Sequence, residues 1–289
     1  MITNREIKEE TIQVASLGEL VGVYGEIASI RMKKIRSYVL ANRTFLDAIN
    51  DIFKESLESY SRKLTQLVAK GKLKKGGKVT FLAHNGKTVA VYISANTGFY
   101  GEVVQATYKK FSEEIKEKDF EITIIGKLGR SLFVENHPKK PYTYFELPDF
   151  GVETGKMAEV VKHLVQYERI IVYYGKYKSV ITQTPSKFSI SAGTEVKDEI
   201  KEETTKYIFE PSLEKILMFF ETEIFASLFD QSIRESQLAK FASRILAMDK
   251  ADQNVKKRLK GLRLERLKLA HKLIARKQLN TMSSVMCWR

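Results

Sequence analysis

Residues 213–283 read LEKILMFFETEIFASLFDQSIRESQLAKFASRILAMDKADQNVKKRLKGLRLERLKLAHKLIARKQLNTMS. The stretch holds no proline and a single glycine, Gly261, and its apolar residues recur mostly at steps of three and four. That spacing predicts a long amphipathic helix, and Pro211 is well placed to open it. At ~1.5 Å per residue the helix would be about 100 Å long, so it exceeds the core of one domain and needs a partner helix.

The N-terminal segment supplies that partner. Residues 1–70 contain no proline, and their apolar residues also recur at steps of three and four, which predicts a second long helix. Gly18, Gly22 and Gly25 weaken it, because each glycine costs up to ~1 kcal/mol relative to alanine. Glycine at this spacing can also let another backbone approach closely. We expect the two terminal helices to bury their apolar stripes against each other as an antiparallel coiled coil.

Between the two helices the hydrophobic period changes. Strand-like apolar runs alternate with helical patterns from 78 to 205, which predicts an α/β fold: a Rossmann-like domain inserted between helices at 1–70 and 209–289. Asn85-Gly86 between two apolar runs predicts a β-hairpin. The predicted strands are 79–83, 89–93, 120–125 and 170–174, with weaker candidates at 188–190 and 207–209, and the predicted helices are 101–118 and 154–167.

The chain carries a large excess of positive charge. Its formal net charge is +14 over 289 residues, which indicates an acidic partner: nucleic acid, an anionic membrane surface or an acidic protein. No signal-peptide segment follows Met1, and no run reaches the roughly 18–20 apolar residues that span a bilayer. The one cysteine, Cys287, fits a reducing compartment. We therefore expect a cytoplasmic protein, or a peripheral part of a larger assembly.

No constellation of residues predicts catalysis. The histidines at 84, 137, 163 and 271 lack metal-ligand spacing, and no nucleophile elbow occurs. The loop 76–79 reads Gly-Gly-Lys-Val and departs from the Walker pattern, which needs Gly-Lys-Ser/Thr. An enzyme built on the α/β domain would need a pocket near 98–101, where the sequence supplies no catalytic groups. We expect no catalytic residue, cofactor or metal in this chain.

Three segments resemble the gamma subunits of F-type ATP synthases. In 235–254, Glu-Ser, then Arg-Ile-Leu-Ala-Met, Ala and finally Asn254 match the spacing of that family's C-terminal helix motif without a gap. Residues 98–101, Gly-Phe-Tyr-Gly, resemble the family's Gly-Leu-Cys-Gly turn, and 124–129 resemble its Ile-Gly-Arg-Lys-Gly. Residues 173–185 resemble a strand and turn late in the gamma domain. The three occur in the family's order and together span most of the chain.

Two regions depart from the family pattern. Glu19 and Glu26 stand where the family has basic residues, and in the C-terminal tip only Ile274 agrees with the family's motifs. The resemblance therefore implies a divergent gamma subunit. It would belong to an F-type ATPase, or to a paralogous F-like ATPase motor that serves another process such as gliding or cell-surface motility.

By this resemblance the chain is a central rotor shaft and is not catalytic. It would turn inside a hexameric ring of alpha- and beta-type subunits and couple ATP hydrolysis or synthesis there to rotation. ATP, ADP and Mg²⁺ are then expected on the partner subunits. The α/β domain would lie at the foot, peripheral to the inner face of the cell membrane, and bind an epsilon-type subunit, a membrane rotor ring or other machinery. The hairpin at Asn85-Gly86 is a candidate contact there.

The resemblance also implies contact residues. Arg244 and Met248, with Leu17, Leu20 and Tyr24 opposite, would lie in or near the stretch where the helices pair. Arg244 would stabilise that pairing or touch the ring, unless it is a plain surface arginine. Further along the helix, we expect a charged collar that faces acidic loops of the ring. The additional contact residues are Asn254, Lys256, Lys257, Arg258, Lys260, Arg263, Arg266 and His271.

The basic run from Lys256 to Lys277 has two other interpretations. It could be a solvated helix face, or it could lie along phosphates in a basic coiled-coil protein that binds nucleic acid. Aromatic residues for base stacking are missing from the run, which argues against single-strand binding. We therefore expect no nucleic-acid partner.

Overall fold

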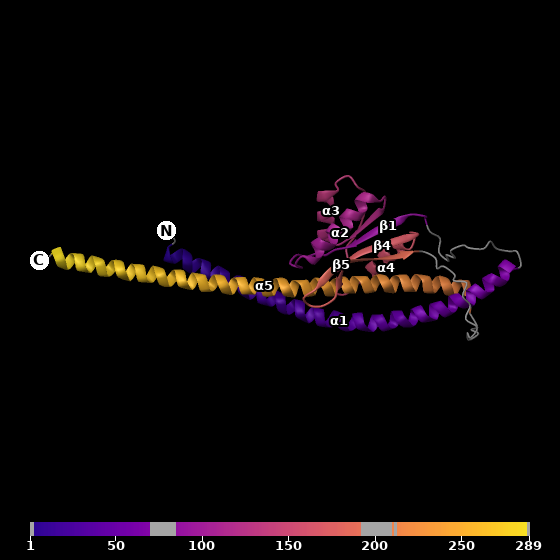
Figure 1. The fold of residues 1–289 in the computed structure, drawn as a ribbon, viewed down its shortest axis with the longest axis horizontal. Helices are drawn as coiled ribbons and strands as arrows, with labels where there is room; N and C mark the ends of the chain where they lie inside the picture. Colours follow the sequence, from indigo (N-terminus) through magenta and orange to yellow (C-terminus); the bar gives the residue numbers. More distant parts are fainter. Residues whose placement is uncertain (1–2, 70–84, 192–209, 211–212, 288–289) are drawn as a thin grey trace. The chain divides into compact units, whose positions relative to one another are not determined.

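A long helix lies toward each end of the chain. The computed structural model describes residues 3–69, 85–191, 210 and 213–287. The terminal helices are α1 (Asn4–Ala69) and α5 (Leu213–Cys287), and the elements between them form an α/β body (Figure 1). Both predicted helices are confirmed. The segment boundaries predicted at 70, 78, 205 and 209 fall outside the described residues.

The α/β body is built on one five-stranded sheet in the order β3-β2-β1-β4-β5. The first four strands in the chain are parallel, and β5 pairs antiparallel with β4. A helix connects each parallel strand to the next, which is the Rossmann-like arrangement that we predicted. The elements are β1 (Thr88–Ile93), α2 (Val103–Glu117), β2 (Glu121–Ile125), α3 (Lys127–Asn136), β3 (Thr143–Phe145), α4 (Thr154–Leu164), β4 (Arg169–Tyr177) and β5 (Gln183–Ser191).

Neighbouring residues of β1 enter two separate cores, because successive side chains of a strand point to opposite faces of the sheet. Ala90 and Tyr92 lie in the core under α2 and α3, while Val89 and Val91 lie in the other. The helices close the first core with four aromatic or aliphatic side chains: Tyr108, Phe111, Ile115 and Phe133.

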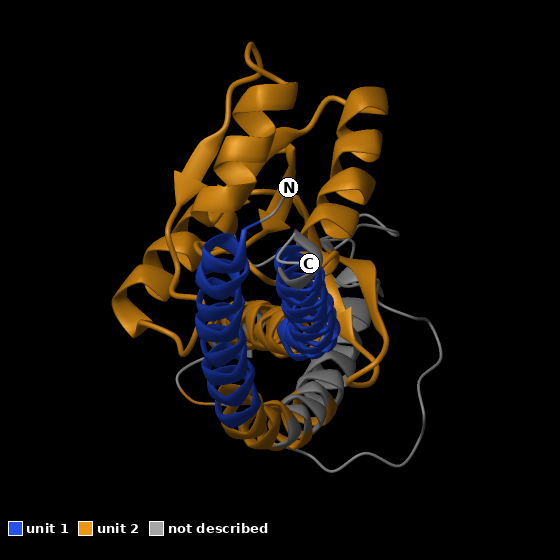
Figure 2. Ribbon diagram, turned by 90° about the vertical axis from the view of Figure 1, so that its left-hand side faces the viewer, with its two compact units in different colours: residues 1–30, 244–289 blue, residues 31–243 orange. Residues whose placement is uncertain are grey.

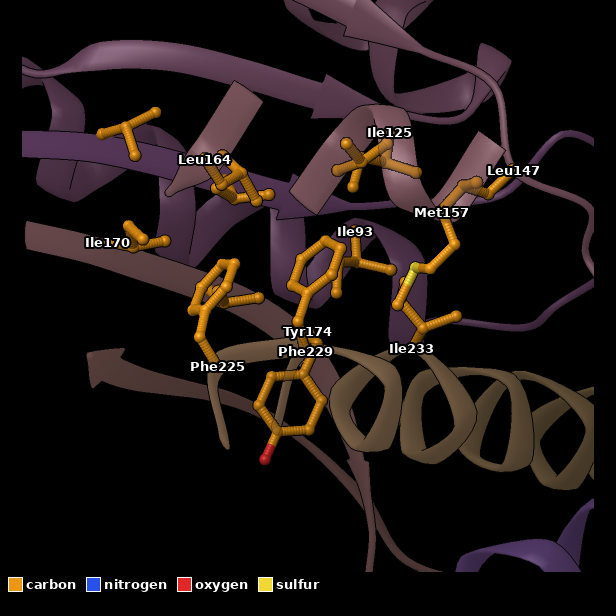
Figure 3. Packing of buried hydrophobic residues seen from close by; sticks show 14 of the residues in the cluster. Ile93, Ile125, Leu147, Met157, Leu164, Ile170, Tyr174, Phe225, Phe229 and Ile233 are labelled. Carbon is orange, nitrogen blue, oxygen red and sulfur yellow. The ribbon is translucent and has the colours of Figure 1, made fainter. Parts of the chain in front are cut away.

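The second core is closed by α4 and by α5 itself (Figure 3). Phe225, Phe229 and Ile233 of α5 lie in one buried cluster with Met157 and Leu164 of α4. The rings of Phe225 and Phe229 stack with their centroids 6.0 Å apart. The C-terminal helix therefore supplies part of the core of the α/β body, and the part of α5 that carries these residues belongs to that body.

Most predicted elements of the body are confirmed, but one pairing is wrong. β1 hydrogen-bonds to β2 along one edge and to β4 along the other. No edge of β1 is left for the hairpin partner predicted at 79–83, which itself lies outside the described residues, as does the weak strand at 207–209. The elements α3 and β3 were not predicted. The predictions at 89–93, 101–118, 120–125, 154–167, 170–174 and 188–190 correspond to β1, α2, β2, α4, β4 and part of β5.

The chain divides into two compact units, each with a part of α1 and a part of α5 (Figure 2). One unit consists of residues 31–243 and contains the α/β body, and the other consists of residues 1–30 and 244–289. In the first unit, Asn42 of α1 donates a hydrogen bond of 3.0 Å to Gln231 of α5, and Arg234 lies over the ring of Tyr38. The two helices are thus in contact beside the body as well.

We predict that Phe229→Ala lowers the free energy of unfolding by about 3–5 kcal/mol, because the ring is fully buried and its loss leaves a cavity. Phe219→Ala on the same helix is the matched control. Its side chain is 62% exposed, so a change below about 1 kcal/mol is expected. Urea denaturation followed by circular dichroism measures both. Equal losses in the two variants would contradict the position of α5 in the core.

Candidate functional site

The place where open α/β sheets usually bind ligands is filled by α5. Such ligands lie beyond the carboxyl ends of the strands, where the strand order reverses. Here that place is between β1 and β4. A Cβ on Gly175 of β4 would lie 3.5 Å from the Cβ of Ala239, and Tyr100 packs edge-on against Phe241 with ring centroids 5.8 Å apart. The chain's own helix thus occupies the crevice that an enzyme of this fold would use.

The turn 98–101, which carries the family resemblance, is shaped by the same helix. Gly101 has a φ of +58°, and a Cβ there would collide with the side chain of Ser243 and lie 3.2 Å from its carbonyl oxygen. Phe99 also has a positive φ, +64°, and is 67% exposed. The motif therefore serves the close approach of α5, and Phe99 is an exposed aromatic side chain beyond the carboxyl end of the central strand β1.

In the unit of residues 1–30 and 244–289, the two helices pair through a seam of heptad spacing. The Cβ position of Gly18 is 3.0 Å from Val255, and that of Gly25 is 3.6 Å from Met248. Seven residues forward on α1 thus match seven residues back on α5, so the pair is an antiparallel coiled coil, as predicted. The buried side chains on the seam positions are Ile7, Val21, Ala28, Met248, Val255 and Leu262.

The three residues of α1 that we predicted in or near the paired stretch lie beside the seam. Leu17, Leu20 and Tyr24 are 52%, 58% and 42% exposed. Each directly precedes a seam position, and one residue turns a side chain by about 100° around a helix. The seam positions themselves hold smaller residues. Gly18 and Gly25 occupy two of them, where Val255 and Met248 leave little room.

These side chains belong to a second stripe, which we call the exposed stripe of α1. Its members are 37–58% exposed. Their steps of three and four place them along one face of the helix. Exposed apolar surface is common at protein interaction sites, which makes the stripe a candidate contact surface. The stripe consists of Leu17, Leu20, Val23, Tyr24, Ile27 and Ile30.

The two α5 residues predicted near the helix pairing are buried. Arg244 is 4% exposed and Met248 is 8% exposed. Arg244 is therefore not a plain surface arginine. Met248 lies against Gly25 and belongs to the seam.

The predicted collar is exposed, but part of its charge is already paired within the chain. Lys256 lies 2.6 Å from Asp252, and Arg258 lies 2.6 Å from Glu10 of α1 and 3.3 Å from Glu265. Hydrogen bonds to these carboxylates raise the pKa of the Lys256 ammonium and of the Arg258 guanidinium. The exposed residues from the prediction are Asn254, Lys256, Lys257, Arg258, Lys260, Arg263, Arg266 and His271.

The last part of α5 presents apolar as well as basic side chains. From Ala270 to Ser284 every residue is exposed. Leu267, Leu273 and Ile274 are about half exposed, at 50%, 48% and 54%. An isolated helix in water is only marginally stable, so this surface is suited to a partner that covers it.

The described parts of the chain contain no cluster of His, Cys, Asp and Glu that could hold a metal ion. Within the same residues, no helix is both long enough and apolar enough to cross a lipid bilayer.

Comparison with known proteins gives consistent matches along the chain. The family model described as ATP synthase matches residues 3–274. The ATP synthase gamma chain of Flavobacterium johnsoniae is 22% identical over 261 residues, which cover 88% of this chain and 87% of the relative. The gamma chain of Flavobacterium psychrophilum is 23% identical over 266 residues, with 88% and 87% covered.

A solved structure shares the fold. The central stalk and c-ring structure of the Tetrahymena thermophila mitochondrial ATP synthase contains a chain that matches with a TM-score of 0.58 at 20% identity. The match covers 80% of this chain and 99% of that chain.

We predict that Gly18→Leu lowers the thermal midpoint of unfolding, because the new side chain would meet Val255 and force the helices apart. Gly22→Leu is the matched control, since a Cβ there meets nothing within 4 Å. The control should leave the midpoint unchanged or raise it, because leucine favours a helix over glycine by up to ~1 kcal/mol. Thermal scans by circular dichroism compare them, and a similar loss in both variants would argue against the glycine seam.

Proposed function

Because the chain belongs to the ATP synthase family, whose model it matches over residues 3–274, we propose that it is the central rotor shaft of an F-type or F-like ATPase. It is a divergent gamma subunit, similar over most of its length to gamma chains. The chain is not itself an enzyme. Catalysis belongs to the beta-type subunits of the complex, which bind ATP, ADP and Mg²⁺.

The dual position of α5 is the observation that carries this proposal. Phe225, Phe229 and Ile233 lie in the core of the α/β body, while Met248, Val255 and Leu262 lie in the seam with α1. All six belong to one helix from Leu213 to Cys287. A twist applied to the paired helices is therefore passed to the body through continuous helical backbone. This is what a shaft requires.

The surfaces left on the helix pair suit a ring of alpha- and beta-type subunits. The exposed stripe of α1 offers apolar contact, and the collar from Lys256 to Arg266 offers positive charge to acidic loops of the ring. Exposed ion pairs are weak and are screened by salt. Such contacts suit a shaft that must leave one position and reach the next, because tight buried pairs would resist each step.

The α/β body would bind the partner that the shaft drives. That partner is an epsilon-type subunit, a membrane rotor ring or other machinery, and the assembly is peripheral to the inner face of the cell membrane. Nucleotide affinity in each catalytic site would then depend on the angle of the shaft. By thermodynamic reciprocity, nucleotide binding would also favour particular angles of the shaft.

The alternative of a basic coiled-coil protein that binds nucleic acid has less support. Glu10, Asp252 and Glu265 pair with cations of the collar, which reduces the charge available to phosphates. The two Flavobacterium relatives are both gamma chains.

We predict that the tagged chain, purified from its own cells at low salt, brings with it two different subunits that carry Walker motifs, each in threefold excess. The eluate should hydrolyse ATP. Recovery of the chain alone, or with nucleic acid and without ATPase subunits, would contradict the proposal.

We predict that the double variant Leu17→Ser and Leu20→Ser binds the ring at least about tenfold more weakly, because each lost apolar contact costs ~1–2 kcal/mol. The free variant should unfold within about 1 kcal/mol of the parent, since both side chains are more than half exposed. Ile181→Ser, at a side chain 79% exposed on the α/β body, is the control. Unchanged ring affinity in the double variant would remove the exposed stripe from the contact surface.

A further inference from the structure

The turn that follows β1 forms a cradle around the carboxylate of Asp149. The backbone N–H groups of Asn96 and Thr97 each donate to Asp149 oxygens at 2.9 Å, and the Thr97 hydroxyl donates to Oδ2 at 2.9 Å. The Asp149 side chain is only 11% exposed. Two backbone N–H groups that converge on one carboxylate make an anion site of the kind that backbone nests provide.

A lysine of α5 closes this cradle. Lys240 Nζ lies 3.4 Å from Asp149 Oδ1 and donates a hydrogen bond of 2.8 Å to the carbonyl oxygen of Ser94. The same ammonium lies 5.7 Å from the centre of the Tyr100 ring, and the Lys240 side chain is 5% exposed. The positive charge that faces the carboxylate is thus buried and comes from the helix.

The Asp149 carboxylate stays ionised in this setting. Burial alone would raise its pKa, but Lys240 and the hydrogen bonds from Asn96 and Thr97 outweigh burial and hold the pKa below its ordinary value. A buried charge of this kind persists only where it is paired and hydrogen-bonded.

The cradle lies at a position in the fold where related sheets bind anions. It is the first turn between a parallel strand and its helix, where nucleotide-binding sheets hold a phosphate with backbone N–H groups. A carboxylate offers the same negative charge and acceptor oxygens. Asp149 reaches the turn from the loop after β3. Asn96 Nδ2 donates to Leu147 O of that loop at 2.7 Å, and Gln237 Nε2 donates to Pro148 O at 3.1 Å and to Gly151 O at 2.8 Å.

We propose that this cradle is an anion-binding site whose permanent ligand is the Asp149 carboxylate, and that Lys240 grips it to lock α5 onto the α/β body. We expect α5 and the α/β body to rotate together as a consequence, and this expectation rests on the proposed function. The anion site itself stands on the geometry alone. Gln237 and Lys240 lie three residues apart on α5, so one face of the helix holds the loop at Gly151 and at Asp149.

The site is tested first in the free chain. Asp149→Ala should lower the thermal midpoint by about 5 °C or more, since Lys240 is left buried without its counter-charge. Sodium formate, at constant ionic strength against sodium chloride, should restore part of that loss by entering the vacated cradle. The response to formate should vanish when Lys240→Met is added. Asp119→Ala, at an exposed aspartate, controls for charge loss alone.

The contrary outcomes are equally specific. The anion site is overturned if Asp149→Ala keeps the parent's midpoint, if formate raises parent and variant alike, or if the response survives Lys240→Met. Asp149→Asn covers the case in which the alanine variant does not fold. Its amide fills the cradle without charge, so the midpoint should fall and formate should have no effect, whereas a parent-like midpoint contradicts the proposal.

The lock is tested in the complete complex. With Cys287→Ser and Ser179→Cys, a single probe on the exposed turn after β4 reports rotation of the α/β body. Asp149→Asn should loosen the attachment of the body to α5, seen as a wider angular fluctuation of the probe during each pause in rotation. If the parent shows no ATP-linked rotation, the proposed function fails. If the parent rotates and the variant's angular fluctuation equals the parent's, only the lock fails.

Discussion

The burial of α5 against the sheet is the interaction on which the rest of the structure depends. A helix can be rotated about its axis only if every side chain on it moves, and Phe229 is held in a close-packed core. The same helix contributes Ala239, Phe241 and Ser243 to the edge where the sheet would otherwise be open to a ligand. A sheet architecture that commonly binds nucleotides here holds a helix of the same chain instead. Its site is closed by the chain's own residues.

The long elements could be predicted from sequence because their evidence is periodic and local. Helices α1 and α5 and strands β1, β2 and β4 repeat their hydrophobic pattern often enough to be recognised. The short strand β3 has only three residues and carries no such pattern. The hairpin prediction failed for a different reason. Asn85-Gly86 is a local signal, whereas the pairing of β1 is decided by strands that lie far along the chain.

The candidate sites were harder to predict, because they depend on side-chain size and on distant pairs. Periodicity alone does not distinguish a seam lined by Gly18 and Gly25 from the larger residues beside it. The contact of Arg258 with Glu10 joins opposite ends of the sequence, and that of Lys240 with Asp149 joins two separate elements. No spacing rule connects such residues. The resemblance of 235–254 to a family motif located the important part of α5 without revealing what its side chains touch.

The seam of small against large residues also limits how the gene can change. Gly18 faces Val255 and Gly25 faces Met248. One residue inserted into either helix would shift this register, and large side chains would then face large side chains in the rest of the seam. A compensating codon in the other helix would have to arise at the matching level. Changes in length should therefore accumulate in the segments that join the elements, while the two helices keep their residue count. The seven-residue spacing between Gly18 and Gly25 should therefore change more slowly among related chains than most other positions of the sequence.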